Sequence, residues 1–164
     1  MARKRLGFGA LVGLMLLLSA GLSGASTLPK DARKRRVNPH TGRPIVTPSG
    51  RKMTDSELRA LALAHGLKDV EKALAIMKRE SGGDPGVVLD TRGMSSAELF
   101  DYWHIKAKPE LSVGLFQINL LANASLVPGD SLDAKVRALQ NPETNADVAR
   151  RLSNGGTSWG PWGG

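Results

Sequence analysis

The chain has 164 residues, enough for one domain with attached segments, and its lack of cysteine excludes disulfide bonds and thiolate metal sites. The formal net charge of +8 suggests nucleic-acid binding, but residues 1–53 carry 11 Lys/Arg against one Asp, whereas residues 54–164 carry 12 Lys/Arg against 14 Asp/Glu. The basic character therefore belongs to the N-terminal part, and nucleic acid is not an expected partner of the folded part.

The first 25 residues have the layout of a secretory signal peptide. A basic start at residues 3–5 precedes an apolar run from Leu6 to about Ala20, and small residues lead to a cleavage position after Ala25. A non-cleaved signal anchor is the alternative, because the run approaches a length that spans a bilayer. Both interpretations predict an exported protein of the periplasm, the cell envelope or the extracellular space, anchored to the membrane if the segment is retained.

Residues 26–53 are predicted to be a flexible, disordered basic arm. They hold four prolines and eight Lys/Arg and show almost no apolar periodicity. The run RKRR at 33–36 can attract an anionic wall polymer or a membrane surface through charge alone, and a solvated linker is the alternative.

Regular structure is predicted to begin at Thr54, where TDSE forms a capping box before apolar residues at helical spacing. A second helix is predicted over about 69–81 and ends at two glycines. Glu80 follows Met77 by three positions, so its side chain is expected on or beside the buried face of this helix.

The remaining segments are predicted to form a loop over 84–94, a short helix opened by the capping box SSAE at 95–98, and a helix from about Gly114. Two further amphipathic helices are expected over 131–140 and after Asn141, which is followed by a proline at the first helical position. No run of alternating strand residues appears after residue 54. The domain 54–164 is therefore predicted to be mainly α, with one compact core.

Several common catalytic motifs are absent, among them the P-loop, GxGxxG before a helix, HExxH and GxSxG. His40, His65 and His104 lie far apart in the sequence, so no metal site and no cofactor is predicted. Carboxylate chemistry remains, because a glutamate whose pKa is raised by burial can donate a proton to a glycosidic oxygen. Glu80 at a helix end beside a buried face fits this requirement, and a solvated helix end is the alternative.

A second segment, SVGLFQIN at 112–119, places Gly114 and two amides, Gln117 and Asn119, within six residues. The amides can bind sugar hydroxyl or acetamide groups, or they can be satisfied inside a core helix. Tyr102, the only tyrosine, lies in an aromatic cluster with Phe100 and Trp103 that can stack on sugar faces or belong to the core.

Four segments in order, AIMKRESGGDP, SVGLFQIN, NPETNADVARRL and GGTSWGPW, resemble the lysozyme-like lytic transglycosylase superfamily. The similarity is greatest to the short GLFQIN type of phage virions and secreted bacterial cell-wall enzymes, and it covers about residues 70–162. It implies a lysozyme-like helical domain that cleaves the β-1,4 bond between N-acetylmuramic acid and N-acetylglucosamine in peptidoglycan. It also implies that the general acid is Glu80, and that the candidates for substrate contact are Ser81, Ser112, Gly114, Gln117, Asn119, Tyr102 and Asn154.

The resemblance leaves the outcome of the reaction open. In transglycosylases of this type the N-acetyl group of the substrate assists, and the C6 hydroxyl closes a 1,6-anhydro ring. In a lysozyme water attacks and a second acid becomes useful, and the acids that the sequence offers for it are Asp84, Asp90, Asp101 and Glu110. The alternative from another class is a non-catalytic envelope or virion module that binds peptidoglycan, which has no need of Glu80. The oligomeric state stays undetermined.

Overall fold

The computed structural model describes residues 37–103 and 106–163 of the chain. Its α-helices are α3 (Asp55–Ala64), α4 (Val70–Ser81), α5 (Ser96–Trp103), α6 (Leu120–Asn123), α7 (Leu132–Leu139) and α8 (Pro142–Leu152), and its 3-10 helices are η1 (Ala124–Leu126) and η2 (Gly160–Trp162). Its strands are β1 (Val46–Thr47), β2 (Val88–Asp90), β3 (Leu111–Val113) and β4 (Ile118–Asn119). Within these described residues, no helix has both the length and the apolar character that a membrane crossing requires. The signal segment and the run 33–36 lie outside the described residues.

The predicted helices are confirmed where capping signals defined them. The Thr54 side chain accepts a hydrogen bond from the Glu57 amide, and the Glu57 carboxylate accepts one from the Thr54 amide. Ser95 and Glu98 make the same reciprocal pair ahead of α5. The side chain of Asn141 accepts from two amides at the start of α8, as expected for an N-cap residue followed by proline.

The mainly α prediction agrees with the helices of the structure, but it did not include the four-stranded antiparallel sheet in the order β1-β2-β3-β4. Its registers pair Val46 with Leu89, Leu89 with Ser112, and Ser112 with Asn119. The loop predicted over 84–94 therefore contains β2. Strands of two or three residues are too short for a period of two to be visible in the sequence, which is why the sheet was missed.

The segment GLFQ at 114–117 is the turn of the β3–β4 hairpin and not the start of a helix. Gly114 has φ +79° and Gln117 has φ +45°, and neither value is compatible with a right-handed helix. Leu115 and Phe116 of the turn are fully buried in the main core. The apolar run that suggested a helix is thus a turn whose side chains fill the space between the helices.

The prediction of a flexible arm up to residue 53 is wrong for residues 37–53, which pack against the rest of the domain. Ile45 is 1 % exposed, and β1 pairs with β2. The side chain of buried Asn38 donates hydrogen bonds to the carbonyl oxygens of Asp90 and Arg92. These contacts are made to residues more than 40 positions away, so local composition did not reveal them.

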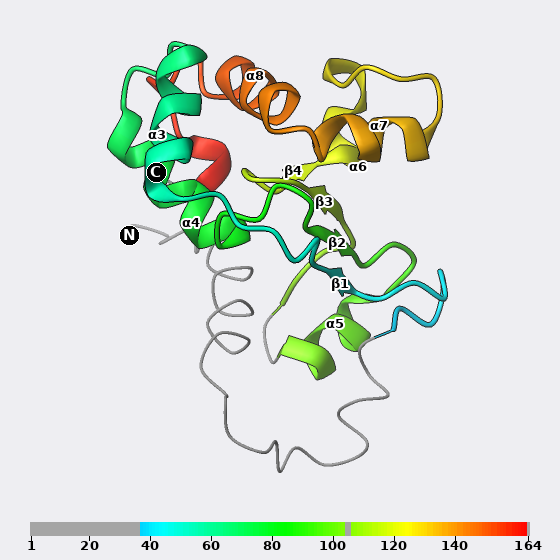
Figure 1. Cartoon of the computed structure of the whole chain (residues 1–164). Coiled ribbons are helices and arrows are strands. Elements are labelled where there is room, and N and C mark those ends of the chain that lie inside the picture. The colour runs from blue at the N-terminus through cyan, green and yellow to red at the C-terminus, as the bar shows by residue number, and fades with distance from the viewer. Residues whose placement is uncertain (1–36, 104–105, 164) are drawn as a thin grey trace.

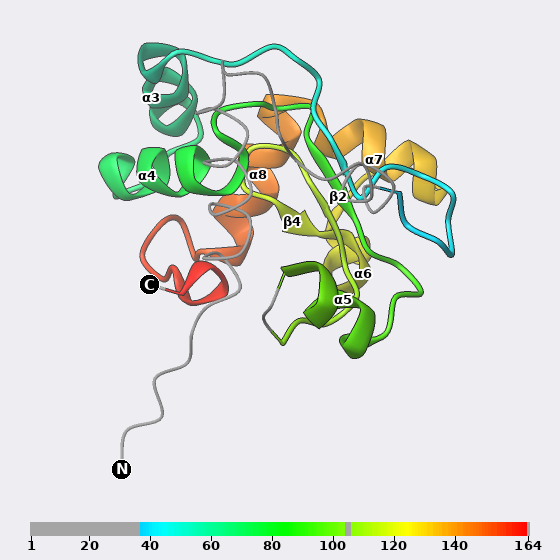
Figure 2. The ribbon, with the colours of Figure 1, turned by 90° about the horizontal axis from the view of Figure 1, so that it is seen from below.

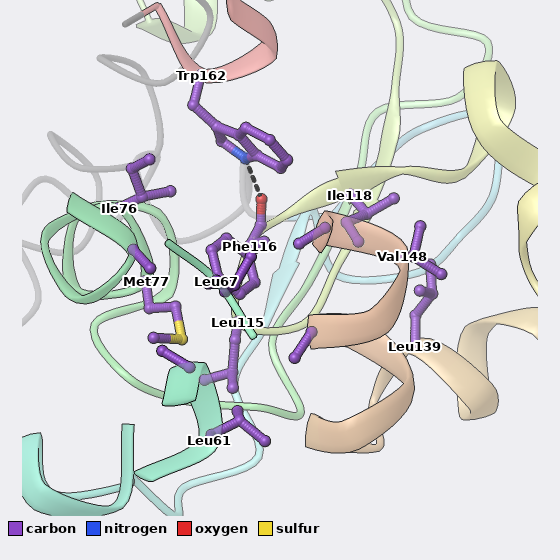
Figure 3. Packing of buried hydrophobic residues seen from close by; sticks show 14 of the residues in the cluster. Leu61, Leu67, Ile76, Met77, Leu115, Phe116, Ile118, Leu139, Val148 and Trp162 are labelled. Carbon is purple, nitrogen blue, oxygen red and sulfur yellow. Dashed lines mark hydrogen bonds between the residues drawn. The ribbon is translucent and has the colours of Figure 1, made fainter. Parts of the chain in front are cut away.

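Two apolar clusters hold the sheet between helices. Figures 1 and 2 show α5 on the side of the sheet opposite α7 and α8. Helix α3 packs against both α4 and α8. The smaller cluster lies between the β1–β2 region of the sheet and α5, and it consists of Ile45, Leu89, Met94, Leu99 and Ala107. The larger cluster joins α3, α4, α8, the hairpin turn and the C-terminal turn, as the side chains in Figure 3 show.

The C-terminal tryptophans, Trp159 and Trp162, belong to this larger cluster. Trp159 stacks on Phe116 at a centroid distance of 6.3 Å, and Trp162 contacts both rings edge-on. The indole Nε1 of Trp162 donates a 2.7 Å hydrogen bond to the carbonyl oxygen of Phe116 (Figure 3). The turn that contains η2 is thereby fixed next to the hairpin turn and the end of α4.

Candidate active site

Glu80 lies in the last turn of α4, and the residue is 2 % exposed. The buried face of the helix includes Ala73, Leu74 and Met77, so the predicted position of Glu80 on this face is confirmed. Gly82 follows as a left-handed C-cap with φ +62°, a conformation that glycine adopts without steric cost. The helix therefore ends one residue after Glu80, whose carboxyl group lies inside the protein.

A pocket of about 210 Å³ opens beside Glu80, where the end of α4 meets the β3–β4 hairpin and the C-terminal turn. It is lined by Glu80, Glu110, Ser112, Gln117, Ile118, Asn119, Asn123, Leu152, Pro161 and Trp162. One part of this lining consists of carboxyl, hydroxyl and amide groups, and the other consists of apolar side chains from β4, α8 and η2. Such a mixture suits a ligand that carries both hydroxyl groups and apolar faces.

Burial raises the pKa of Glu80 to about 7, and the negative charge of Glu110 adds to this increase. The neighbouring guanidinium of Arg79 acts in the opposite direction, since its Nε and Nη2 lie 2.9 and 2.8 Å from Glu80 Oε1. Arg79 is only partly buried and exposes 38 % of its side chain, so solvent weakens its effect relative to that of burial. Glu80 consequently keeps its proton at pH values where an ordinary glutamate has lost it, as a general acid requires.

The structure singles out one of the four acids that spacing alone did not distinguish. Glu110 lines the pocket together with Glu80 and is 7 % exposed. Asp84 instead binds the Ser49 hydroxyl and the amides of Ser49 and Gly86, and Asp90 pairs with Arg92 at 2.7 Å. Asp101 is exposed on α5.

Burial also raises the pKa of Glu110, against the effect of the Ser112 hydroxyl, which donates a 2.8 Å hydrogen bond to Glu110 Oε2. The Thr91 hydroxyl accepts a hydrogen bond from the Glu110 amide, and the Thr91 amide donates one to the Glu110 carbonyl oxygen. The segment before β3 is thus held firmly against the residue that follows β2. The sequence offers Glu110 only as one of several acids, because nothing in it places this residue near Glu80, 30 positions earlier.

The two amide side chains of the hairpin, Gln117 and Asn119, line the pocket. The Gln117 side chain donates to the carbonyl oxygens of Gly114 and Val87, while its buried Oε1 has no partner among the described residues. The Asn119 side chain accepts from the Leu121 amide and caps α6, and Asn123 donates to the Asn119 carbonyl oxygen. Asn123 was not predicted, and it is brought to the pocket by α6, whose short length left no periodic signal.

Three of the remaining predicted contact residues lie away from the pocket lining. The Ser81 hydroxyl donates to the Met77 carbonyl oxygen inside the core. Gly114 faces the Asn145 side chain, and Asn154 is an exposed residue with φ +51° after α8. The side chain of Tyr102 lies outside the described part of the structure, and so does His104.

His65 is the C-cap residue of α3, and its Nε2 lies 2.6 Å from Glu143 Oε2. Over residues 37–103 and 106–163, no three His, Asp or Glu side chains gather in a way that could hold a metal ion. The chemistry that this pocket offers through its described residues is that of two buried carboxyl groups.

Replacing Arg79 with glutamine is expected to raise the pKa of Glu80 further, because the substitution removes the cation that stabilises the charged carboxylate. Titration of the Glu80 carboxyl carbon by NMR measures this change. Lys78→Gln is the matched control, since Lys78 precedes Arg79 on α4 but pairs with Asp55 at 2.9 Å. A Glu80 pKa that is equal in both variants would contradict the role assigned to Arg79.

Comparison with known proteins gives one match. A family model described as lysozyme-like domain matches residues 59–164 of the chain. Neither the curated proteins nor the solved structures contain a match. The matched range includes every residue that lines the pocket.

Proposed function

Because the chain belongs to the family of lysozyme-like domains, in the lytic transglycosylase superfamily, we propose that it cleaves the β-1,4 bond between N-acetylmuramic acid and N-acetylglucosamine in peptidoglycan. Family membership supports a peptidoglycan-related glycosidase. The observation that carries the specific assignment is Glu80, a buried carboxyl group with a pKa of about 7 in the wall of a pocket lined by amides and apolar side chains.

Glu80 acts as the general acid in this proposal. Its Oε1 accepts the guanidinium hydrogen bonds of Arg79, so Oε2 is the oxygen that carries the proton. Oε2–H donates this proton to the glycosidic oxygen, the bond to C1 breaks, and an oxocarbenium-like centre forms on the muramic acid sugar. The apolar surroundings of Glu80 keep its carboxyl group protonated before this step, so that the proton is available to the leaving oxygen.

The rest of the pocket positions the glycan. Gln117, Asn119 and Asn123 supply amide groups that can bind acetamide and hydroxyl groups of the sugars. Leu152 and Trp162 supply an apolar wall for the faces of the rings. These contacts hold the glycosidic oxygen next to Glu80, and such positioning lowers the entropic part of the barrier.

A non-catalytic module that binds peptidoglycan is the competing interpretation. A binding surface gains nothing from two carboxyl groups whose burial is unfavourable in their charged forms. The arrangement therefore favours a reaction over binding alone.

Export and the basic segment complete the proposal. The signal-like first 25 residues would bring the enzyme to the side of the membrane where peptidoglycan lies. The run at 33–36 would increase its local concentration near anionic wall polymers or membrane surfaces.

Incubation of the full chain with purified peptidoglycan, followed by mass spectrometry of the soluble fraction, tests the proposed function. The expected products are muropeptides whose masses contain whole disaccharide units. A folded protein that sediments with several kinds of cell wall, yet releases no soluble glycan from any of them, would favour the binding module.

A further inference from the structure

Glu110 is a buried carboxyl group without a cationic partner. Among the described residues, no Lys, Arg or His lies within ion-pair distance of it. Its hydrogen-bonding partners are the neutral hydroxyl groups of Ser112 and, through the backbone, Thr91. A buried carboxylate that is not paired with a cation lowers the stability of the fold, so its presence calls for a reason other than stability.

The geometry connects Glu110 with Glu80. The two side chains line the same pocket from different elements, Glu80 from the end of α4 and Glu110 from the residue before β3. The Ser112 hydroxyl donates its hydrogen bond to Glu110 Oε2, whereas Glu110 Oε1 has no hydrogen bond to the described residues. One carboxyl oxygen of Glu110 is therefore available to a molecule in the pocket. In glycosidases that use two carboxyl groups, one protonates the leaving oxygen and the other serves the incoming group.

We propose that Glu110 is the second catalytic carboxylate, which accepts a proton from the attacking water, so that this enzyme is a hydrolase and forms no anhydro ring. The inference rests on the proposed function and specifies its chemical outcome. The water oxygen forms a bond to C1 of the muramic acid sugar, and one water proton passes to Glu110. The proton of Glu80 passes to the leaving oxygen, and both carboxyl groups then return to their starting states by proton exchange with solvent.

Ser112 is a positioning residue in this scheme. Its hydroxyl donates to Glu110 Oε2 and favours the charged form that a base requires, which opposes the effect of burial on the pKa of Glu110. Activity therefore requires Glu110 in its charged form and Glu80 in its protonated form, and the pH profile of kcat/KM should have two limbs.

The experiment is digestion of peptidoglycan by the full chain in water enriched with ¹⁸O, with mass spectrometry of the product ends. The wild type is expected to release reducing ends that carry one ¹⁸O atom. Glu110→Gln, which keeps the shape of the side chain and its ability to accept from Ser112, is expected to lower the hydrolytic kcat/KM by about 100-fold or more. Asp101→Asn is the matched control, because Asp101 is an exposed acid on α5, and it should leave the rate unchanged.

The outcomes separate this inference from the proposed function. Anhydro ends from the wild type, or a Glu110→Gln variant within threefold of the wild-type rate, would overturn the role of Glu110 while peptidoglycan cleavage stands. The absence of any product from the wild type would instead overturn the proposed function itself.

The variant Ser112→Ala provides a second test of the role of Glu110, which can be used if the Glu110→Gln variant does not fold. The loss of the hydroxyl donor should move the acidic limb of the pH profile of kcat/KM to higher pH and leave the product ends unchanged. An acidic limb that stays at its wild-type position would count against Glu110 as the base.

Discussion

The substitution Glu80→Gln is expected to lower kcat/KM for peptidoglycan by about 10²–10⁴-fold, because glutamine has no proton to donate to the leaving oxygen. Release of soluble muropeptides over time measures the effect. Glu71→Gln is the matched control, since Glu71 lies on the same helix but is exposed and pairs with Arg59 at the surface. A Glu80→Gln variant with at least a tenth of the wild-type rate would show that another group supplies the proton.

The pH profile of the wild type gives an independent check on Glu80. A general acid is active in its protonated form, so kcat/KM should fall as the pH rises through about 7, the pKa to which burial raises this group. Removing the positive charge of Arg79 should move this limb to higher pH. Removing the negative charge of Glu110 should move it to lower pH, because that charge contributes to the high pKa of Glu80.

Stability should change in the opposite direction from activity when Glu80 is replaced. The folded-state pKa of Glu80 lies above its ordinary value of 4.5, so the folded state binds more protons between these two values. The wild type therefore loses stability as the pH rises from about 4.5 to 7. Glu80→Gln is free of this loss, and at pH 8 it should be more stable than the wild type by on the order of 2 kcal/mol. Urea denaturation at pH 5 and pH 8 measures the difference and shows that a loss of activity does not reflect unfolding.

The sequence predicted the parts of the site that depend on local signals. Glu80 could be placed on the buried face of its helix because capping residues and apolar spacing define α4 well. Glu110 could not be selected, because its neighbours in the pocket come from α4, the hairpin and the C-terminal turn. The position of Glu110 in the pocket depends on the pairing of β2 with β3, and strands of three residues give no recognisable pattern in the sequence.

The segment GLFQ illustrates why the fold was only partly predictable. Its apolar pair, Leu115 and Phe116, is compatible with a buried helix or with a buried turn, and the local pattern cannot decide between them. The Asn145 side chain of α8 decides it, since it accepts from the Phe116 amide and donates to the carbonyl oxygens of Val113 and Leu139. A helix through 114–117 would move its partners Val113 and Phe116 away from this buried amide. The conformation of the four-residue turn therefore depends on Asn145, which lies at least 28 positions after the residues of the turn.

Gly114 is needed for this turn because of its surroundings as well as its backbone angle. An added Cβ would lie 2.2 Å from Asn145 Nδ2 and 2.3 Å from the Leu139 carbonyl oxygen, closer than real contacts allow. The carbonyl oxygen belongs to the backbone at the end of α7, so it cannot move without shifting that helix. Gly114 thus permits the close approach of β3 to α7 and α8, and we infer no contact between Gly114 and the substrate.

Gly114→Ala is expected to destabilise the protein by about 3 kcal/mol or more, the sum of the cost of a left-handed residue and of overpacking. Gly66→Ala is the matched control, because Gly66 has a similar φ of +63° but no atom within 4 Å of the added Cβ. That control should lose only about 1–2 kcal/mol, the cost of the backbone angle alone. Urea denaturation of both variants at the same pH measures the difference between them. Equal losses would mean that the hairpin can move away from α7, and that the position of Glu110 and Ser112 in the pocket is less constrained than the hydrogen bonds of Asn145 imply.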